Sequence, residues 1–212
     1  MAKKKRDNNF WTSYSDLMTS LFFVMLVLFV LTITLLHKKI VATQEQLNKI
    51  EEIQNSIKNI NREHFKYDPQ YKRHTLKNVT VSFNQNSFDI NDIPIVEQKR
   101  LIEVGKSIEN FVDSAVIKIP GVKYLMIIEG QSSRDNYHTN AYFNNDVLSF
   151  QRALSLLKYW TEEGVNIDPD YCEIIVSGSG QNSPFRVQPD NRNNRANQRF
   201  VIHIIPKPGN IE

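Results

Sequence analysis

The pattern of apolar and polar positions divides the chain into two stretches of different character. Residues 17–36 form one apolar run, in which 16 of 20 positions are apolar and only Thr19, Ser20, Thr32 and Thr34 are polar. A helix of this length crosses the roughly 30 Å hydrocarbon core of a bilayer. The rest of the sequence has no second run of spanning length. The pattern therefore predicts one membrane helix followed by a domain outside the membrane.

Shorter periodic segments follow the apolar run. Short apolar stretches predict strands at residues 79–83, 124–129, 173–177 and 200–205. Helical spacing predicts two helices, one over 94–112 with Asn91 and Asp92 as its cap, and one over 147–163. The core stripe of the second is expected at Val147, Phe150, Leu154 and Leu157. The order β-α-β-α-β-β predicts a two-layer α/β domain with its helices on one face of a mixed sheet.

The stretch between these two parts contains no Pro or Gly from residue 37 to residue 62, so we expect the membrane helix to continue outward. Ile50, Ile53, Ile57 and Ile60 recur at 3-4-3 spacing. This spacing fits either a short coiled-coil seam or a solvated amphipathic linker. The predicted organisation is a basic tail (1–11), a transmembrane helix (12–36), a helical linker (37–67) and an outer domain (68–212).

The net charge of +3 lies entirely in the first ten residues, and the other 202 residues sum to zero. This distribution excludes a basic face for nucleic acid. Cations before the apolar run predict a cytoplasmic N-terminus and a C-terminal domain on the outer side of the membrane. The alternative, a cleaved signal peptide, is disfavoured because the run exceeds the usual length of about 7–15 residues and no A-x-A site follows it.

Reactive and metal-ligating residues are sparse. The single cysteine, Cys172, excludes a disulfide framework and a multi-cysteine metal site. The five histidines show no ligand spacing, and the turn at residues 178–180 lacks the Lys of a phosphate loop. The sequence therefore predicts no enzyme, no bound cofactor and no metal centre.

Asp16 lies immediately before the apolar run. Thr12 and Ser20 are four residues away on either side and Thr19 is three away, so on a helix the four side chains form one polar stripe. One interpretation is that Asp16 caps the helix or lies at the membrane interface. The other is that the helix begins near Trp11, which places a carboxylate inside the membrane, where such groups are costly and are functional by default.

The segment from Phe10 to Ser20, FWTSYSDLMTS, resembles the membrane helix of MotB-type subunits of ion-driven rotary motors. The resemblance implies a homodimer of such helices inside a pentameric ring of a MotA-like partner. It implies that Asp16 accepts and releases a proton, or coordinates sodium, with Thr12, Thr19 and Ser20 as polar neighbours on the ion path. It also implies a plug or gating helix in the region after the membrane.

The outer domain resembles OmpA-like peptidoglycan-binding domains over residues 79–205. The matching positions are the turn Gly130–Ser133, Asn145 with Leu148-Ser149 and Arg152-Ala153, the turn Gly178–Gly180, and Arg195-x-Asn197-x-Arg199. The resemblance implies a peptidoglycan site made of Ser132, Ser133, Asp135, Asn145, Leu148, Arg152 and Arg199.

The spacing of three of these residues also has a consequence that follows from helix geometry alone. Asn145, Leu148 and Arg152 share one face of a helix, and we expect Arg152 to face outward, where a guanidinium suits the carboxylate of a stem peptide. Ser133 stands where the family has an Asp, and Asp135 is the candidate substitute.

Two classes of function follow from these resemblances. One is an ion-conducting motor subunit of the bacterial inner membrane, single-pass, with a periplasmic C-terminal domain anchored to peptidoglycan. The other is a passive cell-wall anchor. Within the motor class, a flagellar stator and the ZorB-type subunit of Zorya anti-phage motors compete. The short chain, the compact linker and the atypical turn favour the ZorB type, and the choice between proton and sodium stays open.

Overall fold

The structure is a computed structural model that describes residues 6–58, 60–119, 121–134, 144–183, 186–191 and 194–207. The predicted substitute Asp135 lies outside these residues. The chain divides into two compact units, residues 1–50 and residues 51–212, and helix α1 (Arg6–Lys58) continues from the first into the second.

The described residues of the first unit all belong to α1, which runs unbroken through the predicted membrane span and most of the predicted linker. It is the one helix among the described residues that is long and apolar enough to cross a membrane, with a mean hydropathy of 2.6 in its most apolar window. The hydroxyls of Thr19, Thr32 and Thr34 each donate to the main-chain oxygen four residues earlier. These polar side chains are thus satisfied within the helix, as a lipid environment requires.

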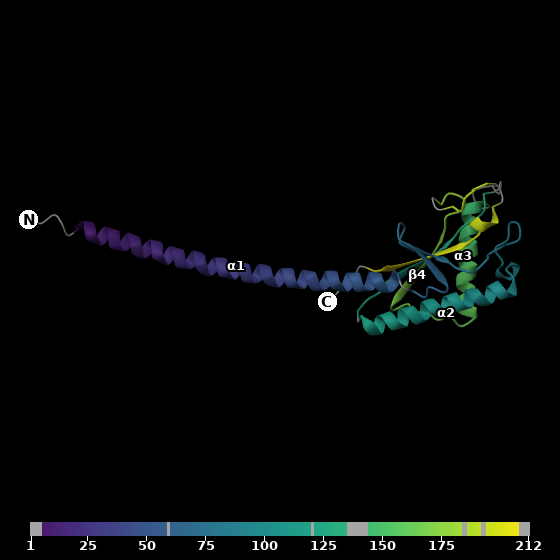
Figure 1. The fold of residues 1–212 in the computed structure, drawn as a ribbon, viewed down its shortest axis with the longest axis horizontal. Coiled ribbons are helices and arrows are strands. Elements are labelled where there is room, and N and C mark those ends of the chain that lie inside the picture. Colours follow the sequence, from purple (N-terminus) through teal and green to yellow (C-terminus); the bar gives the residue numbers. More distant parts are fainter. Residues whose placement is uncertain are drawn as a thin grey trace, which may run out of the picture. The chain divides into compact units, whose positions relative to one another are not determined.

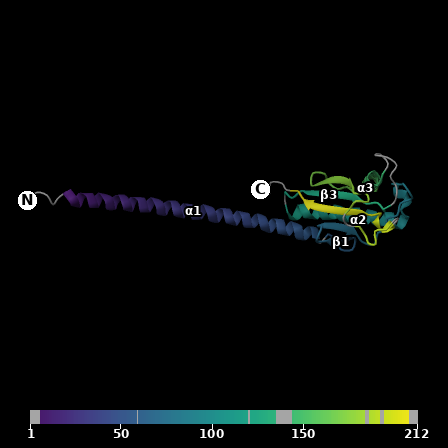
Figure 2. The same ribbon diagram turned by 90° about the horizontal axis from the view of Figure 1, so that it is seen from above.

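The second unit is a mixed α/β fold, which confirms the predicted class (Figure 1). Its sheet has the order β1-β2-β5-β3-β4, in which β3 and β4 run parallel and the other neighbours are antiparallel. Figure 2 shows the same elements from above. Their bounds are β1 Phe65–Asp68, β2 Arg73–Leu76, α2 Ile95–Lys118, β3 Tyr124–Gly130, α3 Asn145–Glu162, β4 Cys172–Gly178 and β5 Phe200–Pro206, with short 3-10 turns η1 (Ile90–Asp92) and η2 (Arg195–Asn197).

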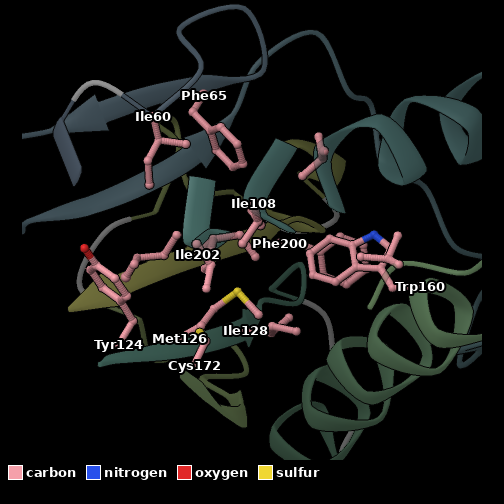
Figure 3. Close-up of a cluster of buried hydrophobic side chains, with 14 of the residues drawn as sticks. Ile60, Phe65, Ile108, Tyr124, Met126, Ile128, Trp160, Cys172, Phe200 and Ile202 are labelled. Carbon is pink, nitrogen blue, oxygen red and sulfur yellow. The ribbon is translucent and has the colours of Figure 1, made fainter. Parts of the chain in front are cut away.

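The core lies on one face of the sheet (Figure 3). Along β3, Tyr124, Met126 and Ile128 are fully buried, whereas the alternate residues are only partly buried. Trp160 of α3 donates its indole N–H to the main-chain oxygen of Leu101 in α2 at 2.7 Å, which ties the two helices together over that face. Each buried side chain of this size contributes about 1.5–3 kcal/mol relative to an exposed one.

Three of the four isoleucines after the apolar run have a different role from either predicted one. Ile53, Ile57 and Ile60 are buried in the core of the second unit. The main-chain oxygen of Ile57 lies 3.0 Å from Nε2 of His74 on β2. Three of the four isoleucines of the 3-4-3 pattern therefore pack within their own chain, whereas Ile50 is exposed.

The predicted strand at residues 79–83 is wrong, and the hairpin β1–β2 was not predicted. Val81 and Phe83 are buried and Thr80 is exposed, so the alternation typical of a strand is present. No main-chain partner lies beside the segment among the described residues, and it forms no ladder. The alternation of apolar and polar residues indicates only which side chains are buried. A β-strand also requires main-chain hydrogen bonds to a neighbouring strand, and this segment has none among the described residues.

The predicted core stripe of α3 is also wrong. Phe150 is exposed and Val147, Leu154 and Leu157 are only partly buried, whereas the buried face combines small and polar side chains with three large apolar ones, namely Asn145, Leu148, Ser149, Arg152, Ala153, Leu156 and Trp160. The reason is the close approach of α3 to two glycines of the sheet, described next.

Candidate functional site

The predicted peptidoglycan site lies at the edge of the sheet that is formed by the carboxyl ends of β3 and β4. The parallel strands β3 and β4 both end there, so the turns that follow them meet. The main-chain N–H of Ser132 donates to the oxygen of Gly180 at 3.1 Å, and that of Gln131 donates to the oxygen of Arg199 at 2.9 Å. These bonds bring the segments after β3, after β4 and before β5 together.

Helix α3 begins at the same edge and packs unusually close to the sheet. A Cβ on Gly130 would collide with the main-chain oxygen of Ser149, and a Cβ on Gly178 would collide with Ser149 and Phe150. The Ser149 hydroxyl donates to the oxygen of Asp146 at 2.8 Å and accepts from the N–H of Gly180 at 2.9 Å. The glycines and the serine together fix the start of α3 against both turns.

Arg152 is buried rather than facing outward, so the prediction of an outward orientation is wrong. Its exposed fraction is 3%. Its Nε donates to the main-chain oxygen of Ser87 at 2.9 Å, and its guanidinium carbon lies 4.5 Å from the ring centroid of Phe83. The segment after residue 79 therefore covers the charged group that sequence spacing alone placed in solvent.

The other predicted residues on this side are also buried. Ser132, Ser133, Asn145 and Leu148 all have exposed fractions below 5%. The Ser133 hydroxyl accepts from Nε2 of Gln198 at 3.2 Å. The Ser132 hydroxyl is buried and has no hydrogen-bond partner in the part of the chain that the structure describes. A buried hydroxyl without a partner is uncommon and marks a place where a ligand or an ordered water would gain a bond.

Arg199 belongs to a second network on the other face of the same edge. Its Nε donates to the side-chain oxygen of Gln131 at 2.8 Å, and Gln131 donates to Glu129 and to Ser183 at 2.9 Å each. Glu129 also accepts from Ser179 and lies 2.8 Å from Nε2 of His203. The network links β3, β5 and the turn after β4.

This network controls the ionisation of Glu129. Burial alone would raise the pKa of the carboxyl group, but the hydrogen bonds from His203, Gln131 and Ser179 outweigh it and lower the pKa to about 2. Burial lowers the pKa of Arg199, with nearby Arg73 and Arg186 acting in the same direction.

No sequence pattern pointed to Arg134, Arg186 and Asp190. The Asp190 carboxylate lies 2.8 Å from Nε of Arg186 and 3.1 Å from a terminal nitrogen of Arg134. Arg186 also donates to the main-chain oxygen of Ser132 at 3.0 Å. Arg186 and Asp190 are four residues apart and Arg134 is more distant, but none of the three lies in a helix or strand, so no periodicity identifies them. They make the edge rich in guanidinium groups, which favours carboxylate ligands.

The second predicted site is the polar stripe around Asp16. Because α1 begins at Arg6, Asp16 lies ten residues inside a continuous helix and does not cap it. Ser20 donates to the oxygen of Leu17 at 2.9 Å, and Thr19 donates to that of Ser15 at 2.8 Å. Their oxygen lone pairs stay able to accept from other groups.

No group of three His, Cys, Asp or Glu side chains in the described ranges is arranged to hold a metal ion.

No protein-family model and no curated protein sequence matches the chain. Solved structures with similar folds include the periplasmic domain of MotB from Helicobacter pylori, with 17% identity, 68% of this chain and 81% of that chain covered, and a TM-score of 0.44. They also include a putative MotB-like protein from Desulfovibrio vulgaris, with 18% identity, coverage of 76% and 93%, and a TM-score of 0.45.

A third similar structure is the OmpA-like domain of FopA1 from Francisella tularensis subsp. tularensis SCHU S4, with 16% identity, coverage of 67% and 79%, and a TM-score of 0.41. At these identities and TM-scores, the matches do not assign a function to this chain.

Proposed function

We propose that the chain is the B subunit of an ion-driven motor in the bacterial inner membrane, a homodimer within a pentameric ring of a MotA-like subunit. Asp16 carries the proton or sodium ion, with Thr12, Thr19 and Ser20 beside it. The C-terminal domain lies in the periplasm and attaches to peptidoglycan. Among such motors, we propose a ZorB-type role in anti-phage defence, with a flagellar stator and a passive wall anchor as alternatives.

The observation that carries the motor function is the position of Asp16 within α1. The carboxylate lies well inside a continuous helix, immediately before 20 residues that contain no charged side chain. A charged group there costs free energy unless it faces protein or water. Each elementary charge that crosses the membrane releases about 2.3 kcal/mol per 100 mV, which is the energy source of the proposed motor.

Attachment to peptidoglycan is supported by the chemistry of the sheet edge. Arg134, Arg152, Arg186 and Arg199 gather around these turns, with Asp190 paired to the first and third, and a buried Ser132 hydroxyl lacks a partner among the described residues. The carboxylates of a stem peptide complement such a site. Because Arg152 is covered by the Phe83–Ser87 segment, binding through its guanidinium requires that segment to move.

The test compares Asp16→Asn with Thr34→Val, a matched variant that removes a polar group from the same helix outside the stripe. Both are expressed with a MotA-like partner subunit, and ion flux, membrane level and co-purification with the ring are measured. We expect Asp16→Asn to abolish flux while level and assembly stay at wild type, and Thr34→Val to retain flux. A passive anchor keeps its function in both variants.

The choice of process has its own test. In cells that carry the whole operon, phage challenge and motility are measured for wild type, Asp16→Asn and Arg152→Ala. The ZorB-type role predicts loss of protection in both variants and unchanged swimming. Loss of swimming in Asp16→Asn with unchanged phage sensitivity identifies a flagellar stator instead.

A further inference from the structure

Strand β4 is an outer strand of the sheet, and β3 is its one strand partner among the described residues. The outer strand on the opposite side, β1, has four residues and carries Lys66 and Asp68. Short length and charged side chains protect an outer strand from pairing with another chain. β4 has seven residues, and Glu173 is its one charged residue, so its free edge lacks this protection.

The hydrogen bonds at the two ends of β4 show which main-chain groups lie on its free edge. The oxygen of Tyr171 accepts from the N–H of Tyr124 at 2.7 Å, and the N–H of Ser179 donates to the oxygen of Gly130 at 3.1 Å. Both flanking residues thus direct their main-chain groups toward β3. Because this direction alternates along a strand, the even-numbered residues between them direct theirs away from β3.

Three even-numbered residues precede the end of β4. The N–H of Cys172 donates to the main-chain oxygen of Asp168 at 2.9 Å, outside the sheet, which agrees with this assignment. Ile174 and Val176 make no main-chain bond on the free side to any group in the part of the chain that the structure describes. These two residues therefore form the open edge of the sheet.

Apolar surface continues from this edge onto helix α3. Ile175, on the sheet face away from the core, is 42% exposed, and Phe150 of α3 is 41% exposed. The main-chain nitrogen of Phe150 lies beside Gly178 at the end of β4. Leu154 and Leu157 follow Phe150 at helical spacing and are only partly buried. The open edge therefore adjoins an apolar stripe of α3, made of Phe150, Leu154 and Leu157, that its own chain leaves partly uncovered.

A second copy of the chain covers the edge and the stripe together. When two β4 strands pair antiparallel about a two-fold axis at Ile175, Ile174 and Val176 of each copy exchange main-chain hydrogen bonds with Val176 and Ile174 of the other. Helix α3 packs against both β3 and β4, so the two α3 helices then lie two strand spacings apart, which is about 10 Å. Helices pack at about 8–10 Å, so the two α3 stripes meet.

We infer that β4 and the α3 stripe join the outer domains of two copies of this chain, so that their sheets become one. Charge favours this register, because Glu173 faces Ser177 of the second copy rather than another carboxylate, and Lys207 of its own chain lies 2.5 Å from it. An extended peptide would pair with the edge but leave the stripe uncovered. The inference rests on the proposed homodimer, whose membrane helices keep two copies together. The pairing residues 174–176 are not among those proposed to bind peptidoglycan.

The test is disulfide cross-linking of the full-length chain in membranes, co-expressed with a MotA-like partner subunit. In the proposed register the two copies of residue 175 form a non-hydrogen-bonded pair with Cα atoms about 4.5 Å apart, a distance that a disulfide bridges. We expect Ile175→Cys to give a covalent dimer on a non-reducing gel after mild oxidation with copper phenanthroline. Ile205→Cys is the matched control, because Ile205 is 43% exposed on the same sheet face but lies on β5. It should stay monomeric, as should wild type, whose Cys172 is buried.

A second pair of variants, made in the Ile175→Cys chain, tests the helix stripe. Phe150→Ser removes one exposed ring from each α3, and we expect the cross-linking rate to fall about tenfold or more. Ile117→Ser, at an exposed position on α2 outside the proposed interface, should leave the rate unchanged.

No dimer from Ile175→Cys, equal cross-linking of Ile205→Cys, or an unchanged rate in Phe150→Ser overturns the interface. Cross-linking of Ile175→Cys to a different protein overturns a second copy as the occupant. Ion flux is measured on the same membranes, so loss of the cross-link with flux retained overturns the interface and leaves the motor function standing.

Discussion

The Nε atom of Arg152 donates a hydrogen bond of 2.9 Å to the main-chain oxygen of Ser87, 65 positions earlier in the chain. Phe83 lies under the same guanidinium group. Arg152 therefore fastens the segment between β2 and α2 to helix α3, in addition to any role toward a ligand. Variants of Arg152 need a stability measurement beside every binding measurement, since a loss of either property can arise from the other.

Replacing Arg152 by Lys keeps the charge but removes the Nε donor and the planar group that stacks on Phe83. We expect the free energy of unfolding to fall by about 1–3 kcal/mol, measured by chemical denaturation of the full chain in detergent. Arg195→Lys is the control, because Arg195 is exposed and surface changes of this kind stay within about 0.5 kcal/mol. Equal stabilities of the two variants would contradict the fastening role of Arg152.

Gly130 has a packing constraint that can be tested in isolation. Its added Cβ in Gly130→Ala would collide with the main-chain oxygen of Ser149, so α3 must move away from the sheet. We expect a loss of about 1–3 kcal/mol in thermal or chemical unfolding. Gly121→Ala is the comparison, since nothing lies near its Cβ and only its φ of 84° opposes the change. A smaller loss in Gly130→Ala than in Gly121→Ala would refute the collision.

The same close approach explains why the sequence misplaced the buried face of α3. Apolar spacing favours Phe150 and Leu154 as core positions, since a pattern ranks residues by hydrophobicity alone. The structure buries Ser149 and Ala153 because small side chains let the helix reach Gly130 and Gly178. Close approach between two elements is a tertiary property, and no local pattern reports it.

Other parts of the fold were predictable because their apolar pattern is long and regular. The strand at residues 124–129 is strongly patterned and was predicted with nearly the observed extent, and the apolar run after Asp16 lies within the single long helix α1. The hairpin of β1 and β2 has four-residue strands whose members include Lys66 and Arg73, so its apolar signal is weak. The candidate site residues were predicted from motifs that resemble those of known families. The ion pair of Arg186 with Asp190 depends on how the loops pack, so no motif or periodic pattern in the sequence predicts it.

The Glu129 carboxyl group should make stability depend on acid. Its pKa is lowered from 4.5 to about 2 in the folded chain, so it contributes stability above pH 4.5 that is lost as the pH falls toward 2. A shift of this size corresponds to about 3 kcal/mol. Glu129→Gln should therefore be less stable than wild type at pH 6, and the difference should shrink toward pH 2. Glu173→Gln, at an exposed carboxylate on β4 that pairs with Lys207, is the matched control. A difference that does not vary with pH would contradict the assignment.

His74 titrates in a higher pH range and with the opposite charge change. Burial lowers its pKa from 6.5 to about 4, against a raising contribution from the oxygen of Ile57, with nearby His203 lowering it further. The rings of Phe65 and Tyr67 pack against it. The folded chain binds the proton less readily than the unfolded chain, so stability is complete above pH 6.5 and falls as the pH drops toward 4.

The expected loss from this group between pH 7 and pH 4 is about 3 kcal/mol, and the His74→Gln variant should lack it because glutamine does not ionise. Chemical denaturation at each pH, followed by the fluorescence of buried Trp160, measures the difference. Because His74 bonds to Ile57, the hydrogen-exchange protection factors of residues 53–58, corrected for the intrinsic pH dependence of exchange, should also be lower at pH 4 than at pH 7 in wild type. His37→Gln, at an exposed position in the first unit, should follow the wild-type curve. Parallel curves for wild type and His74→Gln across pH 4–7 would exclude His74 as the source of the acid sensitivity.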